Sequence, residues 1–361
     1  MATRLLLSVA LSVAAAQSYE IGKLPAMGYN TWNDVRCDGV DAHTILSLAH
    51  GLVQSNFSEK GYAFLNVDDC WQAQLLGARG ELVPDATKFP DGLKVVVDKV
   101  HALGLRFGLY ADRGFYTCAF RAGSRHQEAT HAKQFHAWQI DYLKYDSCWA
   151  PNLRRKGALE DYARMRDALT LHAPGVHYSL CGWSSWYAPL VSNQQGYHSW
   201  RIGADCDEFA NIYEAARTME GLAHYAGPGK GYNDPDMLVG TTGGGAIALT
   251  PEQSRTQFSL WALFPAPLLI SQNMLGWSSF ALETYSNDEV IQLNQEPNAR
   301  AAVRLVGGEL DGPSTCHKRS ATTNCTNVWG RALRSGGEIA IAFVNNAPES
   351  RFVACDAACP L

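Results

Sequence analysis

The stretch Asp141-Tyr-Leu-Lys-Tyr-Asp-Ser-Cys148 is the part of this chain that decides the fold. It reads as an extended run, and the side chains of a strand alternate between its two faces. Lys144, Asp146 and Cys148 are therefore expected to face the same space. Because a lysine favours the ionised form of a nearby carboxyl group, Asp146 has the setting of a carboxylate nucleophile. The alternative is a solvent-facing ion pair, and polar residues at other strand ends argue against it.

Short strand-like runs alternate with helix-like runs along most of the chain. The predicted strands end near Asn30, Asp68, Ala111, Asp146, Leu180, Arg201, Asp236 and Ser271. The amphipathic stretches between them are Asp41–Glu59, Asp91–Leu103, Gln127–Gln139, Leu159–Leu171, Asp207–Leu222 and Pro251–Phe264. Strands and helices in this number and order predict an α/β fold of the (β/α)8 barrel type. A doubly wound open sheet is the alternative, but no G-x-G-x-x-G loop follows the first strand.

Composition divides the chain into three parts. Residues 1–16 combine Arg4, an apolar run and three alanines, which predicts a secretory signal peptide. Residues 17–300 are the predicted barrel, and residues 301–361, with alternating runs such as Glu338–Val344, predict a C-terminal antiparallel β domain. A signal peptide implies a secreted, lysosomal or vacuolar protein whose ten cysteines are disulfide candidates. Two sequons are candidates for glycosylation, Asn56–Ser58 and Asn324–Thr326.

Charge and motif content exclude several classes of partner. The 361 residues carry a net charge of −5 and no basic cluster, so we expect no nucleic-acid partner. No later stretch is long enough to span a membrane, since the apolar run Leu260–Ile270 is too short. Neither C-x-x-C nor H-x-x-x-H spacing occurs, so we expect no metal, and nothing implies an organic cofactor.

Acidic and aromatic residues gather at the predicted strand ends, where the catalytic groups of such a barrel lie. Carboxylates accept paired hydrogen bonds from vicinal hydroxyls, and indole rings stack on the apolar face of a pyranose. The sequence therefore predicts a sugar pocket. Its candidate residues are Asn30, Trp32, Asp68, Asp69, Tyr110, Asp112, Lys144, Asp146, Cys181, Trp183, Trp200, Arg201, Asp205, Asp234, Asp236 and Met237.

Five motifs follow one another through this pocket, namely Leu24–Asn33, Asn66–Trp71, Tyr142–Cys148, Ser199–Arg201 with Asp205, and Tyr232–Leu238. Together they resemble glycoside hydrolase family 27, which holds the α-galactosidases and α-N-acetylgalactosaminidases. The resemblance runs in order from about Leu24 to Pro297.

The resemblance implies a retaining enzyme with two catalytic aspartates, Asp146 as the nucleophile and Asp205 as the general acid/base. Burial and a charged neighbour are expected to raise the pKa of Asp205, so that it carries the proton. Asp68 and Asp69 match the pair that binds the 4- and 6-hydroxyls of galactose. Further residues match the substrate-binding set, namely Lys144 and Arg201 as cations, Trp32, Tyr110 and Met237 as walls, and Asp236.

The resemblance also implies two disulfides, Cys37–Cys70 and Cys118–Cys148. Proximity in the sequence pairs Cys316 with Cys325 and Cys355 with Cys359. In the plant and fungal branch of the family, a free cysteine and a tryptophan face the C2 substituent of the sugar, and Cys181 and Trp183 fit that pattern. A Cys181–Cys206 disulfide is the alternative.

The expected activity is exo-hydrolysis of terminal α-linked galactose from oligosaccharides, glycolipids or galactomannan. One alternative is an α-N-acetylgalactosaminidase, whose substrate needs small residues near C2. Another is a non-catalytic sugar-binding protein, which would require the loss of Asp146 or Asp205. Two departures from the family pattern are expected, Gly182 in place of a polar residue and a shortened C-terminal domain. The resemblance leaves a homodimer open.

Overall fold

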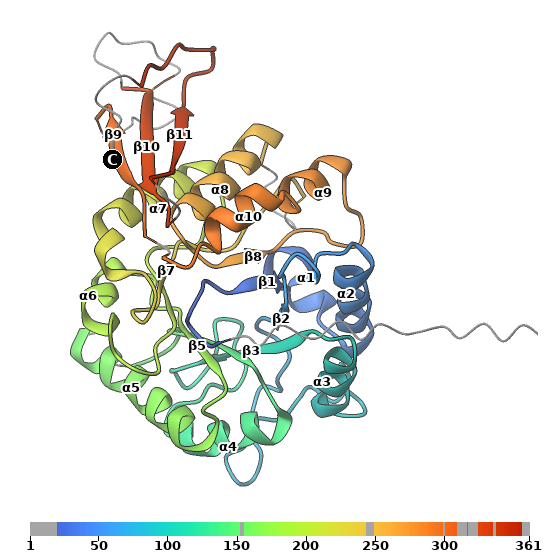
Figure 1. The fold of residues 1–361 in the computed structure, drawn as a ribbon. Helices are drawn as coiled ribbons and strands as arrows, with labels where there is room; N and C mark the ends of the chain where they lie inside the picture. Colours follow the sequence, from blue (N-terminus) through green and yellow to red (C-terminus); the bar gives the residue numbers. More distant parts are fainter. Residues whose placement is uncertain are drawn as a thin grey trace, which may run out of the picture.

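The computed structural model describes residues 20–151, 155–242, 249–298, 300–308, 316, 324–334 and 337–355. Eight parallel strands form one curled sheet, and a separate three-stranded antiparallel sheet follows it (Figure 1). The predicted barrel followed by a β unit is confirmed. The predicted signal peptide, residues 1–16, lies outside the described residues.

The curled sheet contains β1 (Met27–Asn30), β2 (Phe64–Val67), β3 (Arg106–Asp112), β4 (Tyr142–Asp146), β5 (His177–Leu180), β6 (Ser199–Arg201), β7 (Tyr232–Asp234) and β8 (Leu268–Ile270). Neighbouring strands follow the order β7-β6-β5-β4-β3-β2-β1-β8. The ring closes just beyond β7, where Leu238 N donates to Leu269 O at 2.8 Å and Leu238 O accepts from Ser271 N at 2.8 Å. Strand β7 thus ends two residues before the predicted Asp236, and the chain then pairs with β8 at Leu238.

Helices surround the sheet (Figure 1). Those that follow the predicted amphipathic stretches are α2 (Ala42–Gln54), α3 (Leu93–Ala102), α4 (Glu128–Trp138), α5 (Arg155–His172), α7 (Phe209–Leu222) and α8 (Pro251–Leu263). Shorter ones are α1 (Trp32–Gly39), α6 (Ala188–Val191), α9 (Ser279–Tyr285), α10 (Asp288–Asn294) and the 3-10 turns η1 (Ser185–Tyr187) and η2 (Ala223–Tyr225). Asp41 is the N-cap of α2 and accepts a hydrogen bond from Thr44 N, which explains why the helix begins there.

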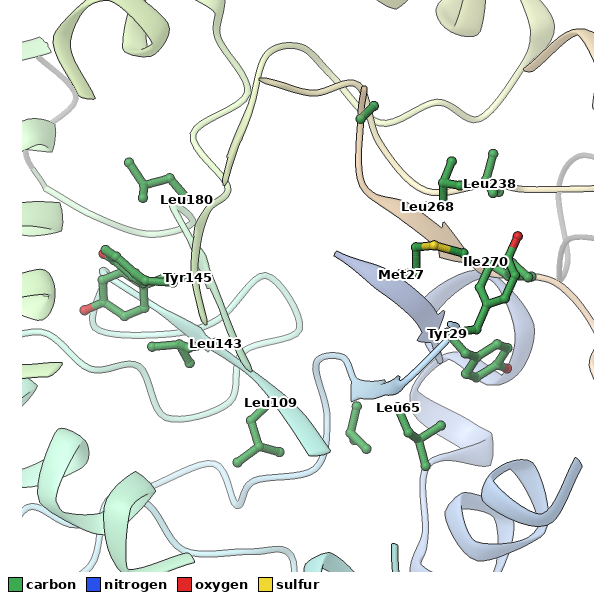
Figure 2. Packing of buried hydrophobic residues seen from close by; sticks show 14 of the residues in the cluster. Met27, Tyr29, Leu65, Leu109, Leu143, Tyr145, Leu180, Leu238, Leu268 and Ile270 are labelled. Atoms are coloured by element: carbon green, nitrogen blue, oxygen red, sulfur yellow. The ribbon is translucent and has the colours of Figure 1, made fainter. Parts of the chain in front are cut away.

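Alternate residues of each barrel strand face opposite sides of the sheet. One set packs against the helices, and its members include Met27, Tyr29, Leu65, Leu109, Leu143, Tyr145, Leu180, Leu268 and Ile270 (Figure 2). The other set faces the barrel interior. There Ala26, Phe64, Tyr142, Met237 and Leu269 form a second, smaller apolar cluster, with Trp32 packed against it. This alternation sends the polar residues at the strand ends into the barrel.

The second sheet contains β9 (Val303–Val306), β10 (Thr326–Ala332) and β11 (Ile339–Asn345), in the order β11-β10-β9. It packs on the carboxyl end of α8, where the rings of Trp329 and Phe264 lie edge to face with centroids 5.2 Å apart. Within the described part of the chain, no helix combines the length and apolar character that crossing a membrane requires.

Candidate active site

The candidate residues meet at the carboxyl ends of the barrel strands. Tyr110 lies on β3, Lys144 and Asp146 lie on β4, and Arg201 ends β6. The loops after these and other strands add a further set, Asp68 and Asp69 after β2, Cys181 after β5, Asp205 after β6, and Asp236 and Met237 after β7. Residues that are distant in the sequence therefore converge on one end of the barrel.

Asp146 is buried and hydrogen-bonded. Its Oδ2 accepts from Tyr110 Oη at 2.9 Å, and its Oδ1 accepts from Ser147 N at 2.9 Å. Burial raises the pKa of Asp146 to about 6, while the charge of Lys144 and the Tyr110 hydroxyl act in the opposite direction. The expected effect of Lys144 is therefore present, but desolvation outweighs it. The carboxyl group of Asp146 is therefore expected to change its charge near pH 6.

Lys144 is held by Asp68 rather than by Asp146. Its Nζ lies 2.8 Å from Asp68 Oδ2, and Asn30 Nδ2 donates to the same oxygen at 2.8 Å. The hydroxyl of Thr31 accepts from the backbone N–H of Asp68 at 2.9 Å, which fixes the carboxylate relative to β1. A carboxylate and an ammonium group in a fixed pair provide both acceptors and donors for sugar hydroxyls.

The side chain of Asp69 accepts hydrogen bonds from backbone N–H groups of the protein. Its Oδ1 accepts from Cys70 N at 2.7 Å, and its Oδ2 accepts from Ala119 N at 2.9 Å. Burial raises the pKa of Asp69 despite these hydrogen bonds. The side chain therefore joins the loop after β2 to the loop that carries Cys118.

Asp205 differs from Asp146 in its surroundings, because its side chain is 67% exposed. Arg201 Nη2 donates to Asp205 Oδ1 at 2.8 Å. Desolvation alone would raise the pKa of Asp205, but the charges of Arg201 and Lys144 together lower it below its ordinary value. The predicted upward shift is thus wrong, because the charged neighbour is a cation that stabilises the carboxylate.

Arg201 also binds Asp236, which connects the sixth and seventh strand ends. Arg201 Nη1 lies 2.8 Å from Asp236 Oδ1, and Asp236 Oδ2 accepts from Cys206 N at 2.7 Å. Burial raises the pKa of Asp236 to about 6, against the lowering effect of Arg201. The φ angle of Asp236 is +92°, an uncommon conformation for a residue with a side chain.

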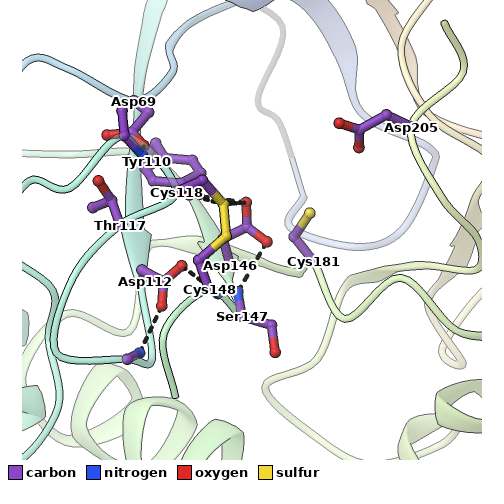
Figure 3. Close-up of a disulfide and its surroundings, with 12 residues drawn as sticks. Asp69, Tyr110, Asp112, Thr117, Cys118, Asp146, Ser147, Cys148, Cys181 and Asp205 are labelled. Carbon is purple, nitrogen blue, oxygen red and sulfur yellow. Dashed lines mark hydrogen bonds between the residues drawn. A yellow bond between two sulfur atoms is a disulfide. The ribbon is translucent and has the colours of Figure 1, made fainter.

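Cys181 and Cys206 are both buried and both free, so the alternative Cys181–Cys206 disulfide is not formed. Figure 3 shows the Cys181 sulfur in the space between Asp146 and Asp205 in that view. Burial raises the pKa of the Cys181 thiol, and the charge of Asp146 adds to this shift. The thiol is therefore a neutral wall of the site.

Cys181 and Trp183, which the resemblance places together against the C2 substituent, lie in different surroundings. Strand β5 ends at Leu180, so neither residue lies on it, and Trp183 has a φ of +52°. Cys181 lines a small cavity of about 20 Å³ inside the barrel, enough for about one water molecule. Trp183 is not among its lining residues and is 42% exposed.

The predicted disulfides brace the loops of the site. Cys37–Cys70 and Cys118–Cys148 are both present, and Cys316–Cys325 joins residues of the C-terminal part. The predicted Cys355–Cys359 pair includes a residue outside the described ones. Figure 3 shows the Cys118–Cys148 bond directly beside Asp146.

One cluster has the composition of a metal site but not its chemistry. Ligand-type atoms of Asp112, Cys118, Asp146 and Cys148 lie within 4.8 Å of one another. The two sulfurs are bonded to each other, so they cannot act as thiolate ligands. Only two carboxylates remain, and burial raises the pKa of Asp112 well above its ordinary value. Asp112, one of the predicted pocket residues, accepts hydrogen bonds from Gly114 N and Cys148 N, so it holds the loops beside Asp146.

Comparison with known proteins agrees with this geometry. Residues 24–296 match the family described as alpha galactosidase A (Melibiase_2). Alpha-galactosidase 3 of Arabidopsis thaliana is 38% identical over 331 residues, which cover 91% of this chain and 70% of that protein. An alpha-galactosidase of Oryza sativa is 37% identical over 278 residues, covering 76% of this chain and 64% of that protein.

A solved structure shares the fold as well. The alpha-galactosidase of Saccharomyces cerevisiae superposes with a TM-score of 0.79 at 28% identity, over 90% of this chain and 74% of that chain. The chain thus spans 64–74% of the length of these three relatives. The family match over most of the chain and the plant relatives show that this protein belongs to glycoside hydrolase family 27.

Proposed function

We propose that this protein is an exo-acting, retaining α-galactosidase that releases terminal α-linked galactose from oligosaccharides, glycolipids or galactomannan. The observation that carries the proposal is the buried Asp146, hydrogen-bonded to Tyr110, at the same barrel end as the Arg201–Asp205 pair. The alpha-galactosidase names of the plant relatives support the same sugar.

In the proposed reaction, Asp146 attacks the anomeric carbon of the galactosyl unit and forms an ester with it. The bond to the leaving oxygen breaks, and Asp205 donates its proton to that oxygen. Asp205, now a carboxylate, then takes a proton from water, and the resulting hydroxide displaces Asp146 from the anomeric carbon. Two inversions release galactose in the α configuration and restore both carboxyl groups.

The acid role of Asp205 belongs to the enzyme–substrate complex. Without substrate its side chain is largely exposed, and Arg201 lowers its pKa. A bound galactoside would cover this side chain, and burial of a carboxyl group raises its pKa. Substrate binding therefore supplies part of the upward shift that proton donation needs.

The pairs around the two aspartates provide the proposed sugar contacts. Lys144 and Asp68 offer a donor and an acceptor at one side, and Arg201 and Asp236 offer the same at the other. Asp69 already accepts two backbone hydrogen bonds, so we infer that it binds a hydroxyl only with its remaining lone pairs while it holds the neighbouring loop.

The preference for galactose over N-acetylgalactosamine is proposed to depend on Cys181. This residue is buried, and its sulfur lies 3.9 Å from Arg201 Nη1, so it occupies space on the wall of the site. An acetamido group needs more room than a hydroxyl group, and a packed wall does not yield easily. Trp183 is proposed to contribute less to this preference, because its side chain is exposed and does not line the inner cavity.

Secretion is likewise proposed. The three disulfides among the described residues are typical of an oxidising compartment, which agrees with a signal peptide at residues 1–16.

The test compares hydrolysis of a chromogenic α-galactoside with that of the matching α-N-acetylgalactosaminide, with the product anomer followed by NMR. We expect cleavage of the galactoside alone, with α-galactose formed first. Comparable cleavage of both substrates would contradict the specificity, and β-galactose as the first product would contradict the mechanism.

A further inference from the structure

Two exposed aromatic side chains, Phe120 and Trp149, lie on the loops that follow β3 and β4. Their ring centroids are 4.5 Å apart, with an interplanar angle of 38°. Phe120 is 55% exposed and Trp149 is 56% exposed. Large aromatic side chains are usually well buried, so an exposed pair that packs on itself indicates a surface for contact with a ligand.

The Cys118–Cys148 disulfide ties this pair to the nucleophile. Trp149 directly follows Cys148, and Phe120 lies two residues after Cys118. Cys118 Sγ is 3.6 Å from Asp146 Oδ2, so the disulfide borders the reacting carboxylate (Figure 3). Each ring is therefore one or two residues along the chain from a cysteine of the disulfide that borders Asp146.

The backbone at both positions is unusual. Phe120 has a φ of +56° and Trp149 a φ of +47°, a region that bulky residues rarely adopt. A turn holds the first of these conformations, since Phe120 N donates to Thr117 O at 2.9 Å. The loops also touch backbone to backbone, because a Cβ atom at Gly114 would lie 2.0 Å from Cys148 O. Strained residues of this kind concentrate at ligand sites, and here both strained residues carry exposed rings.

We propose that Phe120 and Trp149 form an aromatic platform that stacks against the ring of the sugar to which the terminal galactose is attached. This inference rests on the proposed function and extends it to the leaving-group side of the substrate. A pyranose has an apolar face that matches an aromatic ring, and neither side chain carries a charge that would select an ion. A ligand that reaches both Asp146 and the platform is a galactoside extended by at least one further sugar.

The test uses variants that suit the left-handed backbone. Phe120→Gly and Trp149→Asn remove the rings and keep residue types that accept a positive φ, so both proteins should fold. Each is assayed with a disaccharide of galactose α-linked to glucose and with α-galactosyl fluoride, which has no second sugar. Phe343→Ala, at a side chain that is 54% exposed on β11, is the matched control.

We expect each platform variant to lower kcat/KM for the disaccharide about 10-fold, the loss of one stacking contact. For α-galactosyl fluoride kcat/KM should change less than about 2-fold, and the melting temperature should stay level or rise as strain is relieved. Equal losses on both substrates with a lower melting temperature would show that the rings only brace the loops and would overturn the inference. An unchanged disaccharide-to-fluoride ratio would overturn it too. A wild-type enzyme inactive on both substrates would instead overturn the proposed function, and this inference with it.

Discussion

The buried carboxyl group of Asp146 holds its proton more strongly than the exposed carboxyl group of Asp205. The proposed glycosylation step needs the reverse arrangement, with the proton on Asp205. Between the lowered pKa of Asp205 and a pH of about 6, the two groups together hold one proton. Within that pH window the ratio between the two singly protonated forms does not depend on pH. A constant fraction of the enzyme therefore carries the proton on Asp205 and not on Asp146. Above about pH 6 the pair loses it.

Because the pKa of Asp146 is higher than that of Asp205, two substrates should show different pH profiles. For an α-galactosyl disaccharide, kcat/KM should be highest below pH 6 and fall about 10-fold per pH unit above it, because the acid is lost. α-Galactosyl fluoride needs no proton donor, so its kcat/KM should rise through about pH 6 and then stay constant as Asp146 ionises. Initial rates between about pH 3 and 9 provide the measurement. The same alkaline decline with both substrates would contradict the assignment.

Asp146→Asn should abolish turnover and raise stability at neutral pH. The amide cannot form the glycosyl ester, but it removes a buried anion. Because the pKa of Asp146 rises from 3.8 to about 6 on folding, its contribution to stability is present at low pH and is lost as the pH rises through about 6. We expect the variant to gain about 1–3 kcal/mol over wild type at pH 7 and nothing below about pH 4. Unfolding by urea at both pH values is the measurement.

The exposed Asp98 of α3, which pairs with Lys94 at the protein surface, offers the matched control, since Asp98→Asn should leave turnover unchanged. A variant of Asp146 that is less stable than wild type at pH 7 would show that its hydrogen bonds outweigh the cost of burying its charge.

At the scale of helices and strands, most of the barrel could be predicted because hydrophobic periodicity fixes it. The stretch Asp207–Leu222 becomes α7, and Pro251–Phe264 becomes α8, each within two residues at either end. The stretch Asp41–Glu59 was too long, because α2 ends at Gln54 in a turn whose backbone bonds return to the helix. Periodicity continues past a helix end whenever the following turn also packs on the core.

The parts that sequence could not predict are the places where the backbone departs from regular geometry. Trp183 and Asp236 both have positive φ angles, and these redirect side chains that a strand pattern would place elsewhere. The pKa order of Asp146 and Asp205 was also beyond prediction. It depends on the relative burial of the two groups and on which carboxylate Arg201 contacts.

Glycines in the barrel interior permit close approach of neighbouring strands. A Cβ atom at Gly28 of β1 would lie 2.2 Å from the backbone oxygen of Phe64 on β2, which cannot move without breaking the sheet. Gly28→Ala should therefore lower the free energy of unfolding by about 1–3 kcal/mol or more. Gly221→Ala in α7 is the control, because nothing lies within 4 Å of its added Cβ. There we expect a gain of up to about 1 kcal/mol.

Thermal unfolding of both variants distinguishes the two outcomes. A Gly28 variant as stable as wild type would mean that β1 and β2 can separate without loss, contrary to the packing.

At the scale of the whole molecule, one buried arginine joins the C-terminal sheet to the barrel. Arg331 of β10 donates to Ala262 O at 3.2 Å and to Leu263 O at 3.3 Å, the last two residues of α8. It also lies 3.4 Å from Glu296 Oε2. A cation at the carboxyl end of a helix satisfies carbonyls that have no partner within the helix. Arg331 is 1% exposed, and this burial lowers its pKa.

Arg331→Met keeps most of the side-chain volume and removes the charge, so it isolates this connection. We expect a loss of about 3 kcal/mol in the free energy of unfolding, since two helix carbonyls and Glu296 lose their partner in a buried place. The barrel site is built from other residues, so kcat/KM at 25 °C should stay within about 2-fold of wild type. Arg334→Met, at an exposed position in the bend that follows β10, should change neither quantity. Reduced kcat/KM with unchanged stability would mean that the sheet supports the catalytic loops directly and not only the fold.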